Sequence, residues 1–370
     1  MMKIALLSYD WGEYSIRLAS ALAQQSEVCL LAPRQLTKPH LAKLDPAVHF
    51  HAFDKPRLRQ PLQQLRTIGQ LLRVIRNFAP DLIHIQQGHF WFNFVLPFLG
   101  KMPLVVTIHD PRHHLGDRGA QNTPQWIYDF GFRRAHQLIV HAKQMAQMTI
   151  DEVGIEPEKL HVIPHILLGD EGELPAAQTE PNTIMFFGRI WAYKGLEYLI
   201  RAQPLITARV PDAKIVIAGE GEDFSRYREM MVQPERFVVH NEYVSHEKRS
   251  TLFAEAAIVV LPYVEATQSG VIPLAYNFGK PVVATTVGGL PEMVDHGETG
   301  YLVPPCDAEA LADAVVDLLQ NQERQRQFGR NGYHKLHQLC SPAIVARQTS
   351  AVYTQALHER GGKVIFGEAN

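Results

Sequence analysis

Two cations separated by four residues stand in a segment whose glycines indicate a turn. In FFGRIWAYKG (186–195) an apolar run ends at Gly188, and Arg189 and Lys194 follow before a stretch of helical spacing. A guanidinium fork and a mobile ammonium beside a flexible turn suit a diphosphate. Two solvated surface cations would give the same pattern. The segment is not a Walker A loop, and no GxGxxG follows the first predicted strand.

A second candidate stretch, LPYVEATQSGVIPLAYNFGKP (261–281), combines the carboxylate of Glu265 with hydroxyls and Gly270. If a helix begins near Ser269, the N–H groups of residues 269–272 have no partner within the helix, and the helix dipole adds positive charge there. Such a helix start favours phosphate, and Pro273 fits its first turn. An ordinary strand–turn–helix corner is the alternative for this stretch taken alone.

A histidine ends a third buried run, in VVTIHDP (105–111). At the end of a strand, His109 can face a cleft, whereas a histidine within a strand is more often a satisfied core residue. The chain has 18 histidines, but it has no HExxH, no clustered Cys and His spacing and no DxD pair. We therefore predict that it binds no metal and no other cofactor.

Alternating strands and helices must position these residues. Short apolar runs separated by helical segments predict a parallel sheet covered on both faces, and the pattern restarts after a polar, acidic segment. The fold class predicted is α/β, with two tandem doubly wound Rossmann-like domains that can face each other across a cleft. The expected parts are a first domain at 1–166, a linker at 167–183, a second domain at 184–340, and a C-terminal helix at 341–360 that packs back on the first domain. Ligands of such sheets bind outside the carboxyl ends of the strands.

Composition is that of an ordinary soluble globular protein, with 46% hydrophobic and 20% charged residues and a net charge of −2. The three cysteines are widely spaced, which favours a reducing cytosol over a disulfide framework. Neither a signal peptide nor an apolar run of membrane-spanning length is recognisable. We expect a cytoplasmic protein, with peripheral contact on the inner face of the membrane as an open alternative.

That alternative comes from the predicted helix 59–78. Six basic residues and no acidic residue lie between Lys55 and Pro80. The leucines and isoleucines of this segment recur at helical spacing and predict one apolar face (Leu62, Leu65, Ile68, Leu72, Ile75). The helix can dock on anionic lipid, or it can be a core-packed helix with a solvated basic face.

Taken together, four segments resemble the retaining family 4 glycosyltransferases of the GT-B fold. They are GRIWAYKG (188–195), the glycine corner at 219–221, YVEATQSGVIPLAYNFGKPVVAT (263–285) and GGLPEMVDHGETGYLV (288–303). The His-Asp pair after VVTI is similar to the same family's active-site histidine. The resemblance is specific across 186–303 and looser before 165.

The resemblance implies a role for each candidate residue. Arg189 and Lys194 would bind the donor's diphosphate, and Glu265 would bind hydroxyls of the donor sugar. Backbone at Ser269, Gly270 and Val271 would reach the sugar and the β-phosphate. The remaining roles concern the first domain and the nucleoside: His109 near the sugar's O6 and anomeric carbon, Gly12 at the diphosphate, and Gly188, Tyr243 and Val244 at the base and ribose.

One departure concerns the family's pair of glutamates, of which the second usually holds the ribose and is replaced here by Pro273. The run ATQSGVIPLAY resembles a polysaccharide-assembly branch of the family. The resemblance implies a hexosyltransferase that uses a nucleotide-sugar, with a UDP-sugar such as UDP-glucose expected. Its partner would be an oligosaccharide or lipid-linked glycan acceptor in polysaccharide biosynthesis, and nucleic acid is not expected. A sugar-nucleotide epimerase, a glycan phosphorylase and a non-catalytic nucleotide-sugar-binding protein are the alternatives.

Overall fold

The continuous apolar runs of the first half become the strands of a seven-stranded, all-parallel sheet. The computed structural model describes residues 1–100, 102–112, 123–169 and 179–360. It divides into two compact units, of which the first comprises the described parts of 1–166 together with 341–360. The strand order is β3-β2-β1-β4-β5-β6-β7. The strands are β1 (Lys3–Ser8), β2 (Glu27–Pro33), β3 (His49–Phe53), β4 (Leu82–Gln86), β5 (Leu104–Ile108), β6 (Gln137–Val140) and β7 (Leu160–Val162).

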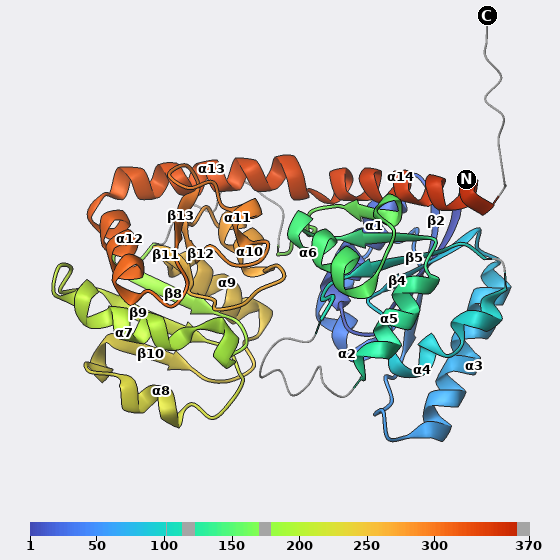
Figure 1. Cartoon of the computed structure of the whole chain (residues 1–370), viewed down its shortest axis with the longest axis horizontal. Helices are drawn as coiled ribbons and strands as arrows, with labels where there is room; N and C mark the ends of the chain where they lie inside the picture. Colours follow the sequence, from blue (N-terminus) through green and yellow to red (C-terminus); the bar gives the residue numbers. More distant parts are fainter. Residues whose placement is uncertain (101, 113–122, 170–178, 361–370) are drawn as a thin grey trace, which may run out of the picture. The chain divides into compact units, whose positions relative to one another are not determined.

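Helices cover both faces of this sheet (Figure 1). α1 and α14 lie on one face, and α3, α4 and α5 pack on the other around the core made by alternate residues of β1, β4 and β5. The helices of this unit are α1 (Gly12–Leu22), α2 (Arg34–Thr37), α3 (Pro61–Phe78), α4 (Phe90–Asn93), α5 (Gln125–Arg134), α6 (Lys143–Met148) and α14 (Pro342–Arg360), with a 3₁₀ turn at Leu96–Leu99.

The C-terminal helix α14 belongs to this first unit although it follows the second in sequence. Tyr353 is buried against the sheet, and its hydroxyl lies 2.6 Å from Nδ1 of His84 on β4. Closer to the C-terminal end of the helix, Gln137 of β6 donates to the carboxylate of Glu359 at 2.5 Å. These contacts attach the C-terminal half of α14 to the central strand β4 and to β6 of the N-terminal sheet.

The second unit, Leu167–Cys340, repeats the architecture with six parallel strands in the order β10-β9-β8-β11-β12-β13. Its strands are β8 (Thr183–Phe187), β9 (Lys214–Ala218), β10 (Phe237–His240), β11 (Ile258–Leu261), β12 (Val282–Thr285) and β13 (Gly300–Val303). Residues 170–178 of the predicted linker lie outside the described residues. The α/β, doubly wound prediction is confirmed for both units.

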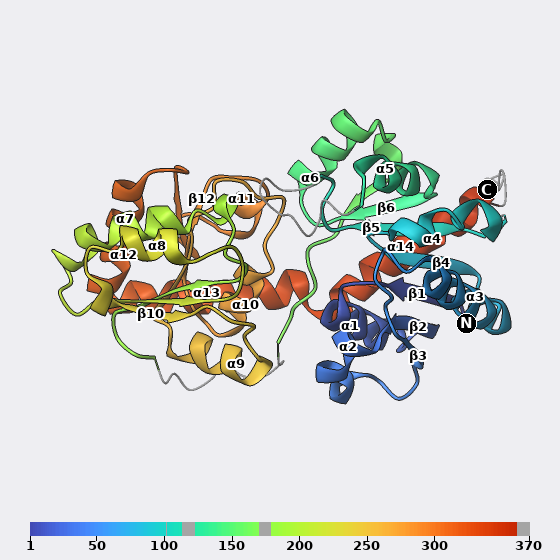
Figure 2. The ribbon, with the colours of Figure 1, turned by 90° about the horizontal axis from the view of Figure 1, so that it is seen from below.

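Two helical layers enclose the second sheet. Figure 2 separates α9 on one face from α7, α8 and α12 on the other, as the two core clusters of this unit do. The helices are α7 (Leu196–Thr207), α8 (Ser225–Met230), α9 (His246–Glu255), α10 (Val271–Asn277), α11 (Leu290–Met293), α12 (Ala308–Gln320) and α13 (Gln322–Cys340). None of the described helices in either unit is both long enough and apolar enough to cross a membrane.

One expectation about α3 is wrong. The spacing placed Leu62 and Leu65 with Ile68, Leu72 and Ile75 on one apolar face, and one of the two alternatives packed that face on the core. The side chains of Leu62 and Leu65 are instead 72% and 58% exposed. The buried face instead contains Ile68 and Leu71 and also the polar Gln64. The side-chain amide nitrogen of Gln64 donates to the carbonyl of Pro56 at 2.9 Å, whereas its side-chain oxygen is buried without a hydrogen-bond partner among the described residues.

Candidate functional site

The centre of the C-terminal sheet holds the cations that the sequence singled out. From β8 the chain continues to β9 and β10 on one side, and then returns to β11 on the other side of β8. The loops after β8 and β11 are therefore neighbours at the carboxyl edge of the sheet. This reversal of strand order is the place where open parallel sheets bind their ligands.

The loop after β8 brings both cations to a pair of tyrosines. Gly188 adopts φ +116°, and the exposed Arg189 follows it with one guanidinium nitrogen 3.2 Å from the hydroxyl of Tyr193. The ammonium of Lys194 lies 3.7 Å from the ring centre of Tyr263 and 4.9 Å from that of Tyr193. Aromatic faces attract cations at these distances, so the two rings orient the ammonium.

Backbone contacts fix the loop after β8 against the loop after β11. The N–H of Val264 donates to the carbonyl of Tyr193 at 2.8 Å. Gly195 has φ +64°, and a Cβ built there would lie 1.9 Å from the carbonyl oxygen of Pro262. A residue with a side chain would therefore be strained in conformation and would also clash, so Gly195 is required for this approach.

The loop after β11 carries the carboxylate and the hydroxyls. Glu265 is half-buried, while Ser269 is buried with its hydroxyl 3.3 Å from that of Tyr263. Burial raises the pKa of the Tyr263 phenol, which keeps this hydroxyl neutral. α10 begins at Val271, two residues after the predicted start, and the N–H of Val271 donates to Ser269 Oγ at 3.2 Å. One of the N–H groups without a partner inside the helix thus already donates to a protein side chain.

The second glycine corner is structural. The N–H of Ile190 donates to the carbonyl of Glu220, and the N–H of Glu222 donates back to the carbonyl of Ile190, both at 2.9 Å. A Cβ on Gly219 or Gly221 would lie 2.0 Å from a carbonyl oxygen of the loop after β8. These glycines let the loops after β8 and β9 run side by side.

Tyr243 and Val244, the residues expected near the nucleotide base, follow β10 at the same edge of the C-terminal sheet. The Tyr243 side chain is 74% exposed, whereas Val244 is half-buried against the core. Their proposed contact with the base stays a prediction.

In the N-terminal unit, His109 follows β5 and its ring is fully buried. The indole of Trp11 stacks on it with ring centres 3.8 Å apart. One ring nitrogen lies 2.8 Å from the side-chain oxygen of Gln86, and the other lies 3.3 Å from Nε2 of His141. The strand-end position is as predicted, but the ring faces protein on every side in this structure. Its role at a sugar stays a prediction.

His109 belongs to a histidine cluster formed by His84, His109, His141 and His165. The centre of the His141 ring lies 4.9 Å from the centre of the His109 ring and 5.1 Å from that of the His165 ring. Burial lowers the pKa of His84 and His141 to about 3 and that of His165 to about 4. Among the described residues no group of His, Cys, Asp and Glu side chains is arranged to hold a metal ion. Burial thus favours the neutral form of all four rings in the folded unit.

Gly12 is explained by packing. Its N–H donates to the carbonyl of Asp10 at 2.9 Å, and a Cβ built on it would lie 2.2 Å from the carbonyl oxygen of Leu36. The glycine thus lets the start of α1 approach α2. A contact between Gly12 and a diphosphate stays a prediction.

Sequence reasoning singled out none of Tyr193, Trp11 or His141. Tyr193 could have been found from its sequence position, because it is an aromatic residue between the candidate cations Arg189 and Lys194. Trp11 stands directly before the glycine that begins α1, but nothing in the sequence indicates that its ring covers His109. His141 in QLIVHA (137–142) directly follows a predicted strand, as His109 does, and this shared position could have marked it as a candidate.

Comparisons with known proteins agree with this architecture. Residues 12–166 match the family described as Glycosyltransferase Family 4, and residues 181–321 match the family described as Glycosyl transferases group 1. A D-inositol 3-phosphate glycosyltransferase from Pseudarthrobacter chlorophenolicus is 28% identical over 356 residues, covering 86% of this chain and 83% of that protein. An uncharacterized glycosyltransferase from Methanocaldococcus jannaschii is 32% identical over 186 residues, or 50% of this chain. The chain spans 47% of the length of that relative.

Among solved structures, that of Anabaena HepE in complex with UDP-glucose has a similar fold. Its TM-score is 0.70 at 19% identity, and the match covers 96% of this chain and 100% of that chain. At that identity the likeness shows the fold alone.

Proposed function

We propose that the chain is a glycosyltransferase of the GT-B type that transfers a hexosyl group from a UDP-sugar, such as UDP-glucose, to an oligosaccharide or lipid-linked glycan acceptor in polysaccharide biosynthesis. The transfer retains configuration and needs no metal ion. The observation that carries this proposal is the convergence of Arg189, Lys194, Glu265 and the start of α10 at the strand-order reversal of the C-terminal sheet.

The reaction places negative charge where these cations stand. As the bond between C1 of the sugar and the phosphate oxygen loosens, charge builds on the departing diphosphate. The guanidinium of Arg189 donates to two oxygens at once, while Lys194 supplies a point charge. Because the rings of Tyr193 and Tyr263 already orient the ammonium, little reorganisation accompanies the reaction.

Proton and bond changes balance without a second carboxylate. The bond from C1 to the phosphate oxygen breaks, and the acceptor oxygen bonds to C1 on the same face of the sugar. The acceptor's proton passes to the β-phosphate oxygen. Glu265 accepts hydrogen bonds from sugar hydroxyls, and backbone N–H groups at Ser269 and Gly270 donate to the sugar and the β-phosphate.

The remaining assignments rest on the resemblance. His109 acts near the anomeric carbon, with its ring oriented by Gln86 and His141. Gly12 approaches the diphosphate. Gly188, Tyr243 and Val244 contact the base and ribose, and the similar fold of a protein solved with UDP-glucose supports uracil as the base.

A thermal-shift screen of UDP, GDP, ADP, uridine and several UDP-sugars tests the donor. A ligand at 100 times its dissociation constant adds roughly 2.7 kcal/mol of stability. We expect a shift with UDP and at least one UDP-sugar, and a much smaller shift with uridine. A preference for GDP or ADP would contradict the choice of base.

Incubation of the stabilising UDP-sugar with and without glycan acceptors tests the reaction. The proposal requires release of UDP that depends on acceptor. Turnover without any acceptor would indicate an epimerase, and turnover that needs inorganic phosphate would indicate a phosphorylase. Tight UDP binding with no turnover under any condition would indicate a non-catalytic binding protein.

A further inference from the structure

The exposed side of α3 is both apolar and basic. Leu62 and Leu65 point away from the core, and Arg66 and Arg73 are exposed beside them. At 100° per residue these four positions fall within a stripe about 100° wide on the helix, opposite the buried Leu71. The stripe therefore interleaves leucines with arginines on a surface that the unit leaves uncovered.

The charge of this region is of one sign. From Lys55 to Pro80 the chain has six basic residues and no acidic residue. Basic residues on this segment can thus attract an anionic surface without competition from carboxylates next to them in sequence.

An apolar trough continues the stripe at the C-terminal end of α3. One cavity of about 350 Å³ is lined by Leu72 and Ile75 of α3, by Arg76 and by Phe98 of the 3₁₀ turn. Phe98 is 81% exposed, the highest value for a phenylalanine among the described residues. Hydration of such a ring is unfavourable, so Phe98 gains free energy by entering an apolar phase.

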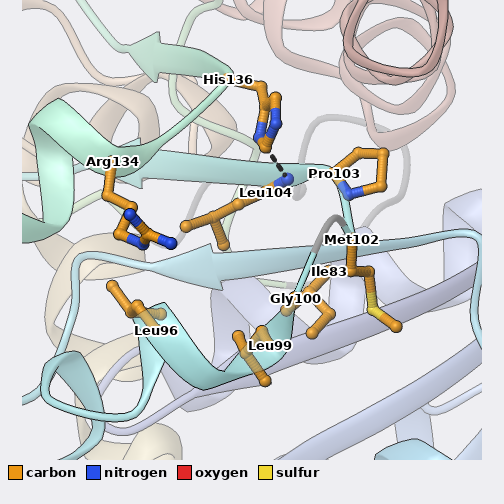
Figure 3. Close-up of a pocket in the computed structure, with 9 residues that line it drawn as sticks. All are labelled: Ile83, Leu96, Leu99, Gly100, Met102, Pro103, Leu104, Arg134 and His136. Atoms are coloured by element: carbon orange, nitrogen blue, oxygen red, sulfur yellow. Dashed lines mark hydrogen bonds between the residues drawn. The ribbon is translucent and has the colours of Figure 1, made fainter. Parts of the chain in front are cut away.

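A second cavity adjoins the first and shares its Leu99 and Met102 walls. It has a volume of about 390 Å³, and Figure 3 shows its lining, in which Arg134 and His136 have the polar side chains. The N–H of Leu104 donates to Nδ1 of His136 at 3.0 Å, so the neutral ring carries its hydrogen on the other nitrogen. The side chains of Arg134 and His136 therefore offer hydrogen-bond donors, which suits the anionic head of an amphipathic molecule.

We propose that this region, defined by Leu62, Leu65, Arg66, Arg73 and Phe98 and named the α3–Phe98 face, docks on an anionic lipid bilayer. The leucines and Phe98 enter the boundary between headgroups and acyl chains, and the arginines pair with lipid phosphates. The trough beside Phe98 accepts part of an acyl chain. This inference is independent of the proposed transfer reaction.

Charge and shape together favour a bilayer as the occupant. A soluble polyanion would be bound by the arginines alone and would leave Phe98 and the trough exposed to water. A bilayer presents phosphates at its surface and hydrocarbon directly below, which matches the interleaved arginines and apolar side chains.

Vesicle sedimentation of the full chain at low salt tests the proposal. Phosphatidylglycerol–phosphatidylcholine vesicles should bind the protein, and vesicles of phosphatidylcholine alone should bind it weakly. Each of Arg66→Gln and Arg73→Gln should lower partition roughly fivefold, which corresponds to the usual contribution of a basic residue near an anionic surface. Phe98→Ser should lower it about tenfold. Added salt should weaken the arginine effect more than the Phe98 effect.

Matched controls exist on other surfaces. Arg347→Gln removes an exposed arginine of α14, on the opposite face of the same sheet, and Val232→Ser removes a side chain of the C-terminal unit that is 71% exposed. Both should bind vesicles as the wild type does. Because all the substituted side chains are exposed, thermal midpoints should agree across the set.

Equal binding to anionic and neutral vesicles, or equal losses in the controls, would overturn the proposal. If Phe98→Ser had no effect while the arginine variants lost binding, the surface would be a general polyanion site and bilayer insertion would be refuted.

Discussion

Acidification should destabilise the N-terminal unit through the histidine cluster. His84, His109, His141 and His165 are buried there as neutral rings that contact protein groups. Burial is the largest cause that lowers the pKa of each, to about 3 for His84 and His141, to about 4 for His165, and well below the ordinary value for His109. The folded unit thus excludes protons that the unfolded chain accepts.

The sign and size of the effect follow from linkage. In the unfolded chain a histidine binds its proton near pH 6.5, so the stabilisation is complete above that pH and is lost as pH falls toward the folded-state pKa. Between pH 7.5 and 5.5 each ring lowers the free energy of unfolding by about 1.4 kcal/mol, and the four rings together lower it by about 5 kcal/mol. A domain is stable by roughly 5–15 kcal/mol, so this loss is a large fraction of the total.

Urea unfolding at a series of pH values measures this loss. We expect the free energy of unfolding of the N-terminal unit to fall steeply from pH 7.5 to 5.5, a range above that in which most carboxylates titrate. His84→Gln should reduce the slope by about one proton. His334→Gln, on the exposed side of α13, is the matched control and should leave the slope unchanged.

Two results would refute this reasoning. One is a free energy of unfolding that stays constant across the range. The other is an NMR titration that shows imidazolium in the folded protein near pH 6 for members of the cluster.

Three further predictions concern the transfer reaction. Glu265→Gln should reduce the rate of sugar transfer strongly while UDP affinity stays nearly unchanged, because UDP has no sugar; parallel rate and titration measurements decide. Transfer should continue in EDTA, since Arg189 and Lys194 compensate the diphosphate charge, and full loss restored by Mg²⁺ or Mn²⁺ would be the contrary result. A deoxyribose analogue should bind within about tenfold of UDP, because Pro273 offers no acceptor to the ribose, and a much larger loss in titration would show that another residue holds it.

The architecture could be predicted because buried parallel strands are continuous apolar runs. The C-terminal helix expected at 341–360 is α14 (Pro342–Arg360). β13 was missed: GYLV at Gly300–Val303 has only four residues, of which two are half-buried, and no long apolar run marks it. Short edge strands give a weak sequence signal because pairing with the adjacent strand, and not their own composition, determines where they form.

The candidate site could be predicted in part. The order of the strands places Arg189 and Glu265 at one edge, and this follows from the parallel pattern. Contacts between distant segments could not be predicted: the ring of Trp11 over His109, and the carbonyl of Pro262 that requires Gly195. On α3, apolar spacing did not show that the buried face includes the polar Gln64 while Leu62 and Leu65 are exposed.

The most direct test of the central claim, that the loop after β8 binds the donor's diphosphate, is calorimetric titration of UDP and uridine into matched variants. Arg189→Ala and Lys194→Ala should each lose about ten- to a hundredfold in UDP affinity, the usual contribution of a charge-assisted hydrogen bond, and should bind uridine as the wild type does. The control Arg326→Ala removes an exposed cation of α13 that is paired with Glu323 and should bind both ligands normally. Equal losses for UDP and uridine, or no loss for either, would contradict the account.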